Sequence, residues 1–116
     1  MNTDLKAATE KIIQFRDERD WAQYHDPKNL AQALSIEAAE LQEIFLWKTT
    51  EQSKNLSQSE KNCVKEELAD IFIYLTYFCR EFKFDLLNEV SEKIKKNGVK
   101  YPVEKSKGLS KKYNAL

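Results

Sequence analysis

The chain has 116 residues, of which 41% are hydrophobic and 33% charged, and its 19 basic and 19 acidic side chains give a formal net charge of zero. Only two Gly and two Pro are present, too few for the turns of a hairpin-rich β protein, so we expect a single all-α domain over residues 1–116 with a modest core. Because the start of the chain lacks a basic and apolar leader and no window approaches the ~20 apolar residues of a membrane span, we expect a cytoplasmic protein without a membrane partner.

The first two predicted helices begin at recognisable caps. Thr3 or Asp4 can cap a helix over about residues 4–20, in which apolar side chains recur at three- and four-residue intervals. After a connector, the Asp-Pro step at residues 26–27 is typical of an N-cap followed by proline at the first helical position. This step predicts a second helix over about residues 27–47.

Two more helices follow a polar loop. The sequence Ser-Gln-Ser-Glu at residues 57–60 matches a capping box and predicts a third helix over about residues 58–82. Asp85 can cap a fourth helix over about residues 86–97, which an Asn-Gly step should end. We expect residues 98–116 to form an irregular tail. The predicted protomer therefore resembles a four-helix bundle.

Two acidic steps lie within the second and third predicted helices. Residues three apart on a helix are neighbours, so each step presents two carboxylates on one face. If these helices form an antiparallel hairpin, both steps lie about 12–15 Å from the turn and are level with each other. Four clustered anions repel one another and lose hydration, so they require a compensating positive charge. The candidate metal-ligating and catalytic residues, which we call the acidic quartet, are Glu37, Glu40, Glu67 and Asp70.

The acidic quartet favours a hard divalent cation. Mg²⁺ takes oxygen ligands in near-octahedral geometry and is commonly shared between carboxylates and substrate phosphates, and Mn²⁺ is the alternative. With His25 as the single histidine, a Glu-x-x-His di-iron site and a zinc site are disfavoured. A cation here would polarise a phosphoryl oxygen and orient a water while a spare carboxylate accepts the proton. Exposed acidic faces are common without a ligand, but two level steps beside apolar stripes favour the metal site.

The third predicted helix is apolar on nearly every face between residues 68 and 79. Asp70 is its only strongly polar side chain in that stretch. Such a helix cannot remain half exposed in a small monomer. We therefore expect its far side to pack against another copy, which makes the protein an obligate homo-oligomer.

Aromatic and polar side chains lie at both ends of the second predicted helix. A nucleobase could stack on Trp21 or Trp47. His25 or Asn29 could then read the edge of the base. A tryptophan is more often a core or interface residue, so this interpretation depends on the rest of the site.

The C-terminal region is basic, because residues 93–116 contain eight Lys and one acid. Lys93 and Asn97 lie four apart on one helical face and Lys100 follows them, a spacing that could grip a triphosphate. A lysine-rich helix end favoured by the macrodipole is equally plausible on spacing alone. We do not expect a nucleic-acid partner, because the overall charge is balanced and no recognised binding motif is present.

In order along nearly the whole chain, these residues resemble the MazG-type all-α nucleoside triphosphate pyrophosphohydrolases, and most closely the dCTP pyrophosphatase branch. The matching segments are Trp21 to His25, Asn29-Leu30, Glu37-x-x-Glu40, Phe45-Leu46-Trp47-Lys48, Glu66 to Ile71, Lys93, Asn97 and Lys100-Tyr101-Pro102. The resemblance implies Mg²⁺-dependent hydrolysis of a nucleoside triphosphate, such as dCTP or a modified dCTP, to the monophosphate and pyrophosphate. In that family the role is house-cleaning of the nucleotide pool, with an active site shared between protomers of a dimer or dimer of dimers. The chain departs from close relatives at residues 97–100, where those tend to be richer in Arg.

The resemblance also implies a role for each candidate residue. The acidic quartet would bind the metal. The residues that would contact the nucleoside are Trp21, His25, Asn29 and Trp47, and those that would face the phosphates are Lys93, Asn97, Lys100 and Tyr101. The alternative function is a non-catalytic helical oligomerisation or interaction module, in which the acidic faces are solvated.

Overall fold

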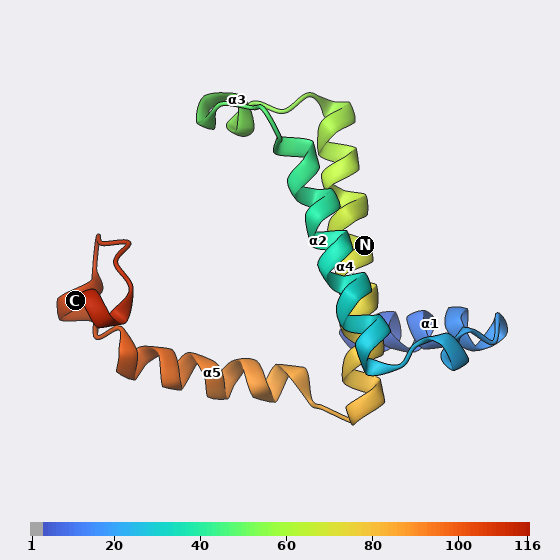
Figure 1. Ribbon diagram of the computed structural model, residues 1–116. Helices are drawn as coiled ribbons and strands as arrows, with labels where there is room; N and C mark the ends of the chain where they lie inside the picture. The colour runs from blue at the N-terminus through green and yellow to red at the C-terminus, as the bar shows by residue number, and fades with distance from the viewer. Residues whose placement is uncertain (1–3) are drawn as a thin grey trace. The chain divides into compact units, whose positions relative to one another are not determined.

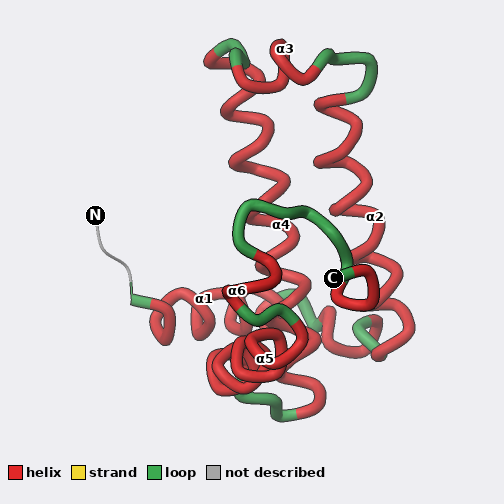
Figure 2. Tube along the Cα trace, turned by 90° about the vertical axis from the view of Figure 1, so that its left-hand side faces the viewer, coloured by secondary structure: helices red, strands yellow, loops and turns green. Residues whose placement is uncertain are grey.

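The computed structural model describes residues 4–116, and no strand occurs among them, so the all-α expectation is confirmed for this part of the chain (Figure 2). Contacts divide the chain into two compact units, of which the first ends at Lys83 and the second begins at Phe84. The single-domain organisation over residues 1–116 stays a prediction. In chain order the elements are α1 (Leu5–Glu18), η1 (Trp21–Tyr24), α2 (Pro27–Phe45), α3 (Thr50–Lys54), α4 (Gln58–Phe82), α5 (Leu86–Lys100), α6 (Val103–Ser106) and η2 (Tyr113–Ala115).

The first unit is built on the antiparallel helices α2 and α4, with α1 packed across α4 (Figure 1). α2 begins where the Asp26 carboxylate accepts a backbone N–H of the first turn at 2.9 Å and Pro27 occupies the first helical position. The apolar stripes of the two helices meet and form the small core of this unit. Its most deeply buried side chains are Leu30 of α2 and Tyr77 of α4, with 1% and 3% of their surfaces exposed.

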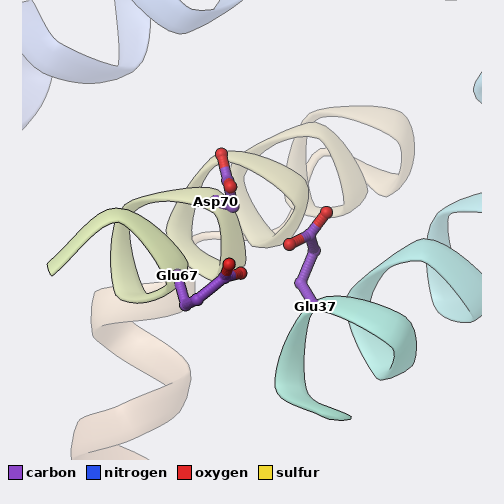
Figure 3. A group of neighbouring side chains, drawn as sticks. All are labelled: Glu37, Glu67 and Asp70. Carbon is purple, nitrogen blue, oxygen red and sulfur yellow. The ribbon is translucent and has the colours of Figure 1, made fainter. Parts of the chain in front are cut away.

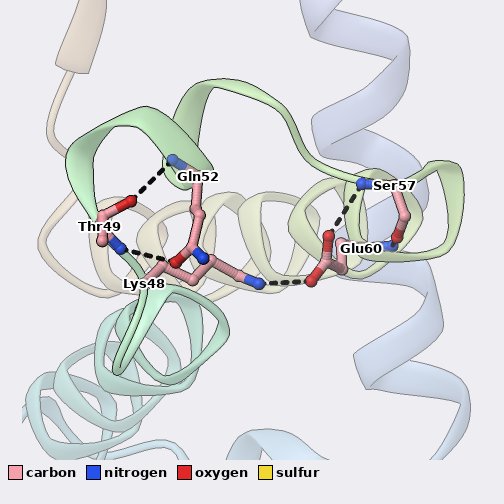
Figure 4. A network of polar contacts seen from close by, with 5 residues as sticks. All are labelled: Lys48, Thr49, Gln52, Ser57 and Glu60. Atoms are coloured by element: carbon pink, nitrogen blue, oxygen red, sulfur yellow. Dashed lines mark hydrogen bonds and ion pairs between the residues drawn. The ribbon is translucent and has the colours of Figure 1, made fainter.

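A network of polar contacts closes the turn between α2 and α4 (Figure 4). The Lys48 ammonium group pairs with one carboxylate oxygen of Glu60, and the other oxygen accepts the Ser57 amide. Thr49 and Gln52 form a second capping box, which starts α3. The polar loop predicted between α2 and α4 therefore contains a short helix, because its Thr-x-x-Gln step is itself a helix start.

Two helices end earlier than predicted. α2 ends at Phe45, because Leu46 leaves the helical region with φ −58° and ψ 132° and Trp47 adopts φ 69°. α1 ends at Glu18, and Asp20 adopts φ 52°. A side-chain-bearing residue in the left-handed region cannot continue a right-handed helix, so each of these residues turns the chain away.

The second unit contains α5, α6 and η2. α5 continues to Lys100, three residues beyond its predicted end, because Gly98 stays helical instead of adopting the left-handed cap expected of it. The helix stops where Tyr101 precedes Pro102, and the residue before a proline is disfavoured in the helical region. Residues 98–116 are therefore not wholly irregular, since they contain the end of α5, the short helix α6 and the turn η2.

Much apolar surface stays exposed in the described part of the chain. Leu68 and Phe72 on α4 expose 51% and 36% of their surfaces, and Ile36 on α2 exposes 57%. A chain of this length normally buries well over half of its surface. The four-helix bundle and the homo-oligomer stay predictions. None of the helices in residues 4–116 combines the length and apolar composition that a membrane crossing requires.

Candidate functional site

Three members of the acidic quartet come together between α2 and α4 (Figure 3). Glu37 points from α2 toward α4, and Glu67 and Asp70 lie on successive turns of α4. One carboxylate oxygen from each of these three side chains lies within 4.8 Å of the others. The antiparallel pairing of α2 and α4 therefore makes the two acidic steps level, as the equal distances from the turn predict.

Two oxygens of this cluster are buried without a hydrogen-bond partner, Oε2 of Glu37 and Oε2 of Glu67. Two ionised carboxylates are both acceptors, so neither can satisfy the other. An unpartnered buried charge is costly, and the facing oxygens therefore require either a shared proton or a cation between them.

The same crowding raises the pKa values of Glu37 and Glu67. Burial raises the pKa of Glu37 from 4.5 to about 7, and contacts with Glu67 and Glu40 and the charges of Glu40 and Asp70 add to the rise. Burial also raises the pKa of Glu67, reinforced by the charges of Glu40 and Asp70. Glu40 is exposed one turn along α2 from Glu37 and acts on Glu37 through a side-chain contact and through its charge.

The donor set fits a hard divalent cation. Within residues 4–116 this is the one group of three or more His, Cys, Asp or Glu side chains whose ligand atoms lie so close together. Carboxylate oxygens are the ligands that Mg²⁺ and Mn²⁺ prefer, and a cation would occupy the place that the two unpartnered oxygens leave for a positive charge. The cluster of Glu37, Glu67 and Asp70 can therefore hold a metal ion.

A cavity of about 400 Å³ adjoins the cluster. It brings Trp21 and His25, two of the predicted nucleoside-binding residues, to the same place as Glu37 and Asp70. The carboxylates therefore form a polar side of the cavity, and aromatic rings form much of the rest. The other lining residues are Lys11, Ile12, Phe15, Ile73, Tyr74 and Tyr77.

His25 is held in this cavity as a neutral ring. Its ring centroid lies 4.8 Å from that of Tyr77 and 6.4 Å from that of Tyr74. Burial lowers the pKa of His25, and the positive charge of Arg16 lowers it further. The buried Nδ1 atom of His25 has no hydrogen-bond partner, so the ring offers an unused polar atom to a ligand.

The structure places the other two predicted nucleoside-binding residues outside this cavity. The Asn29 amide donates to the Tyr24 carbonyl at 3.0 Å and so stabilises the connector before α2. Trp47 lies at the opposite end of α2 with 91% of its surface exposed. It lines a second cavity of about 510 Å³ at the α3 turn, together with Lys48 and Glu60.

The predicted phosphate-binding residues all belong to the second unit. Lys93 and Asn97 are exposed on α5. Lys100 has its Nζ atom 5.0 Å from the ring centroid of Tyr113, and the Tyr101 ring meets the same ring edge to face at 6.1 Å. Lys100 and Tyr101 therefore both contact Tyr113, a residue that the sequence did not single out.

Several lining residues were missed from the sequence. Tyr74 and Tyr77 lie four and seven residues after Asp70, a helical spacing that could have placed them on its face. Lys11 carries no such signal, because only the packing of α1 across α4 brings it to the cavity. Burial raises the pKa of Tyr74, and the nearby carboxylates raise it further, so its hydroxyl stays a hydrogen-bond donor at neutral pH.

The chain is similar in sequence and in fold to known pyrophosphatases. Over 105 residues the chain is 41% identical to dCTP pyrophosphatase 1 of Bos taurus and 38% identical to that of Homo sapiens. These matches cover 89% of this chain and 62% of each relative, so the chain spans about three fifths of the relatives' length. A solved pyrophosphatase from Archaeoglobus fulgidus superposes with a TM-score of 0.81 at 38% identity, covering 88% of this chain and 95% of that chain.

A model of one protein family extends over most of the chain. It matches residues 33–116, which include most of α2, all of α4 and all four members of the acidic quartet. The carboxylate cluster therefore lies wholly within the matched residues. The chain therefore belongs to the MazG-like family.

Proposed function

We propose that this protein hydrolyses a nucleoside triphosphate to the monophosphate and pyrophosphate in the presence of Mg²⁺, for which Mn²⁺ can substitute. The observation that carries the proposal is the cluster of Glu37, Glu67 and Asp70, with two unpartnered buried oxygens beside an aromatic cavity. The names of the relatives, dCTP pyrophosphatase 1, support dCTP or a modified dCTP as the substrate. The reaction adds one water and breaks the phosphoanhydride bond between the α and β phosphorus atoms. The proposed role is removal of unwanted nucleotides from the pool.

In this proposal the acidic quartet divides into two tasks. Glu37, Glu67 and Asp70 would hold the cation, because their oxygens already lie close enough to share it. A bound divalent cation supplies charge neutralisation for the phosphates and lowers the pKa of a bound water. Glu40 is exposed beside the cluster and outside the closest group of oxygens. It is therefore the carboxylate proposed to accept the proton of the attacking water.

The cavity beside the cluster is proposed to bind the nucleoside. Trp21 and Phe15, whose ring centroids lie 5.7 Å apart, would provide apolar surface for the base and the sugar. Neutral His25 has an unpartnered Nδ1 atom that would form a hydrogen bond to the edge of the base. Asn29 would support this region from α2 through its bond to the Tyr24 carbonyl of the connector. Trp47 would contact a nucleoside only in a site completed by another copy of the chain.

The basic second unit is proposed to bind the phosphates. Residues 93–116 of this unit contain eight lysines and one acidic residue. This excess of positive charge attracts anions. Lys93, Asn97, Lys100 and Tyr101 are the residues proposed to contact the phosphate oxygens.

The protein is further proposed to act as a dimer or a dimer of dimers. The exposed apolar side chains of α4, Leu68 and Phe72, support this assembly, since large exposed apolar surface marks an interface. A second copy is the simplest partner, because a two-fold interface places the same patch on both chains.

The activity is tested by measuring pyrophosphate release from a panel of ordinary and modified nucleoside triphosphates, with Mg²⁺ and with a chelator. We expect turnover only with the metal, fastest for a cytosine deoxynucleotide. Glu67→Gln should lower kcat/KM by at least the roughly 10–100-fold that loss of an outer-shell metal partner costs. Glu66→Gln is the matched control, because Glu66 is the neighbouring exposed carboxylate on α4, outside the cluster. Equal activity of the two variants would overturn the assignment of the site.

A non-catalytic interaction module would behave differently. Specific ligands raise the melting temperature by mass action, so Mg²⁺ with a non-hydrolysable nucleotide should stabilise the proposed enzyme. Absence of both turnover and thermal stabilisation across the panel would leave the interaction module as the better account.

A further inference from the structure

The aromatic ring of Tyr113 contacts two lysines near the C-terminus. The Nζ atom of Lys100 lies 5.0 Å from the ring centroid and that of Lys112 lies 5.9 Å from it. Both distances are within the range of a cation–π interaction, which holds an ammonium group at the face of an aromatic ring. Tyr101 meets the same ring edge to face, with an angle of 86° between the ring planes. The ring of Tyr113 therefore contacts two ammonium groups whose residues lie twelve positions apart in the chain.

The backbone after α5 returns to make this contact (Figure 1). The Ser106 hydroxyl donates to the carbonyl of Pro102 at 2.7 Å and also contacts that of Tyr101 at 3.2 Å, which fixes α6 against the end of α5. Gly108 then adopts φ 78°, a left-handed conformation that turns the chain. The segment that follows carries Tyr113 back to Tyr101. The two lysines are therefore held together by a folded segment, not by chance proximity on a flexible end.

No carboxylate neutralises these two lysines within residues 4–116. The four ion pairs in that range involve other residues. Residues 100–116 contain one acid, Glu104, against five lysines. Two ammonium groups held at one ring repel each other, so an anion that bridges them removes an unfavourable interaction as well as adding a favourable one.

We propose that Lys100, Lys112 and Tyr113 form an anion site for the diphosphate or triphosphate part of a ligand, in which Tyr113 is a positioning residue. Lys100 and Lys112 contact the phosphate oxygens, and Tyr113 holds both ammonium groups in place. Naming a polyphosphate as the anion rests on the proposed function, whereas the paired cations rest on the contacts of the second unit. Lys112 and Tyr113 thereby join the residues that determine affinity for phosphates.

The test is calorimetric titration of the full-length protein with inorganic tripolyphosphate in a chelator, so that no divalent cation contributes. Tyr113→Leu removes the aromatic face and should weaken binding about threefold to fivefold, the range expected for one exposed cation–π or ion-pair contact. Lys112→Gln keeps the contact between the rings of Tyr101 and Tyr113 and should weaken binding to a similar extent. Tyr113→Phe keeps the aromatic face and should bind as the wild type does. Lys105→Gln is the charge-matched control and should also bind as the wild type does.

Each other outcome would overturn the proposal. Equal affinity of Tyr113→Leu and Tyr113→Phe would show that the ring does not position the lysines. Equal losses in Lys112→Gln and Lys105→Gln would show only a general effect of charge. Loss of single-stranded DNA binding with unchanged tripolyphosphate affinity would assign the lysines to a nucleic acid instead.

The failure of this inference can be told apart from the failure of the proposed function. If the wild type turns over dCTP while all variants bind tripolyphosphate equally, this inference fails and the proposed function stands. If no nucleotide is hydrolysed, the proposed function fails whatever the titration shows.

Discussion

At the scale of single residues, Glu37 shows how burial and neighbouring carboxylates raise the pKa of a side chain. Its pKa of about 7 has burial as its largest cause and the neighbouring carboxylates as the next. A raised pKa means that the folded protein binds a proton more tightly than the unfolded chain does. Removing that proton without supplying a cation leaves facing anions in contact, and the folded state loses stability.

This linkage gives a pH prediction for the metal-free protein. Between the ordinary pKa of 4.5 and the folded value of about 7 the folded state carries the extra proton, so stability should fall as pH rises through this window. Thermal melts in a chelator should therefore give a lower melting temperature at pH 8 than at pH 5.5. Added Mg²⁺ should restore the melting temperature at pH 8 and have little effect at pH 5.5, where the proton competes with the metal.

The control for this prediction is Glu37→Gln, which cannot ionise. The variant should lose most of the decrease in stability between pH 5.5 and pH 8 and most of the stabilisation by Mg²⁺. A decrease of the same size in Glu37→Gln would assign the pH effect to other groups.

Asp70 allows a second prediction at the same scale. Asp70→Ala removes one of the crowded anions, so the metal-free variant should remain folded and melt at the wild-type temperature or above. Its affinity for Mn²⁺, measured by electron paramagnetic resonance of the free ion, should fall, and pyrophosphate release should fall with it. Unchanged Mn²⁺ affinity would remove Asp70 from the ligand set.

At the scale of elements, the turn between α2 and α4 is closed by Glu60, whose carboxylate makes two contacts. Glu60 accepts the Ser57 amide in the capping box and also pairs with Lys48, which follows the end of α2. The pairing with Lys48 is the largest cause of a pKa lowered from 4.5 to about 2 at Glu60, and the bond from the Ser57 amide adds to it. The contacts of Glu60 thus link the segment after α2 to the start of α4, and these two helices carry the acidic steps.

Glu60→Gln should remove the ion pair while its side-chain oxygen still serves the capping box. A lowered pKa stabilises the folded state fully above 4.5, and this stabilisation is lost as pH falls toward 2. Urea titrations should therefore show the variant less stable than the wild type at pH 7 and equal to it near pH 2. Lys48→Met should behave in the same way, and a difference that persists at pH 2 would point to lost packing instead.

The two glycines provide a matched pair for the second unit. Gly98 lies in α5 in open space, so Gly98→Ala should stabilise the helix by up to about 1 kcal/mol. Gly108 has φ 78°, so Gly108→Ala should destabilise the folded C-terminal segment by about 1–2 kcal/mol, although the added methyl group meets no atom within 4 Å. Hydrogen exchange of the amides of residues 109–116 should increase in Gly108→Ala and not in Gly98→Ala. Equal exchange in the two variants would contradict the role of the turn.

At the scale of the whole molecule, exposed apolar surface is the main physical constraint. Between residues 68 and 79 α4 is apolar on most of its faces, yet α2 and α1 cover only part of it, and Leu68 and Phe72 remain exposed. The proposed assembly would stabilise such a chain, because a partner would remove this surface from water.

The assembly can be tested with Leu68→Asp. A carboxylate in an apolar interface would be desolvated, so this variant should dissociate or unfold, with a smaller particle mass by light scattering and a lower melting temperature. Glu66→Lys is the control, because residue 66 lies two positions earlier and on nearly the opposite face of α4. A wild-type protein with the mass of one chain would contradict the proposed oligomer.

Much of the candidate site could be predicted from the sequence because it depends on helical spacing. The three-residue steps in α2 and α4 place Glu37, Glu67 and Asp70 on fixed faces, and the equal distances from the turn make them level. The aromatic residues that line the cavity with His25 could be predicted only in part. Those of α1 and η1 reach the cavity by packing, which the periodicity of the sequence does not show. Trp47 follows the end of α2 with a left-handed backbone, and its contact with a nucleoside stays a prediction.

The sequence by itself determined the starts of the helices, because a cap depends on residues within one turn. Asp26 and Asp85 each accept a backbone amide three residues on, and Ser57 and Glu60 form the expected capping box. Only the tertiary structure decided which carboxylates face one another without a partner and that the cavity beside them joins α1 to α4. It also decided that Tyr113 returns to Lys100. These features depend on the approach of segments far apart in the chain, whose distances no local pattern of residues specifies.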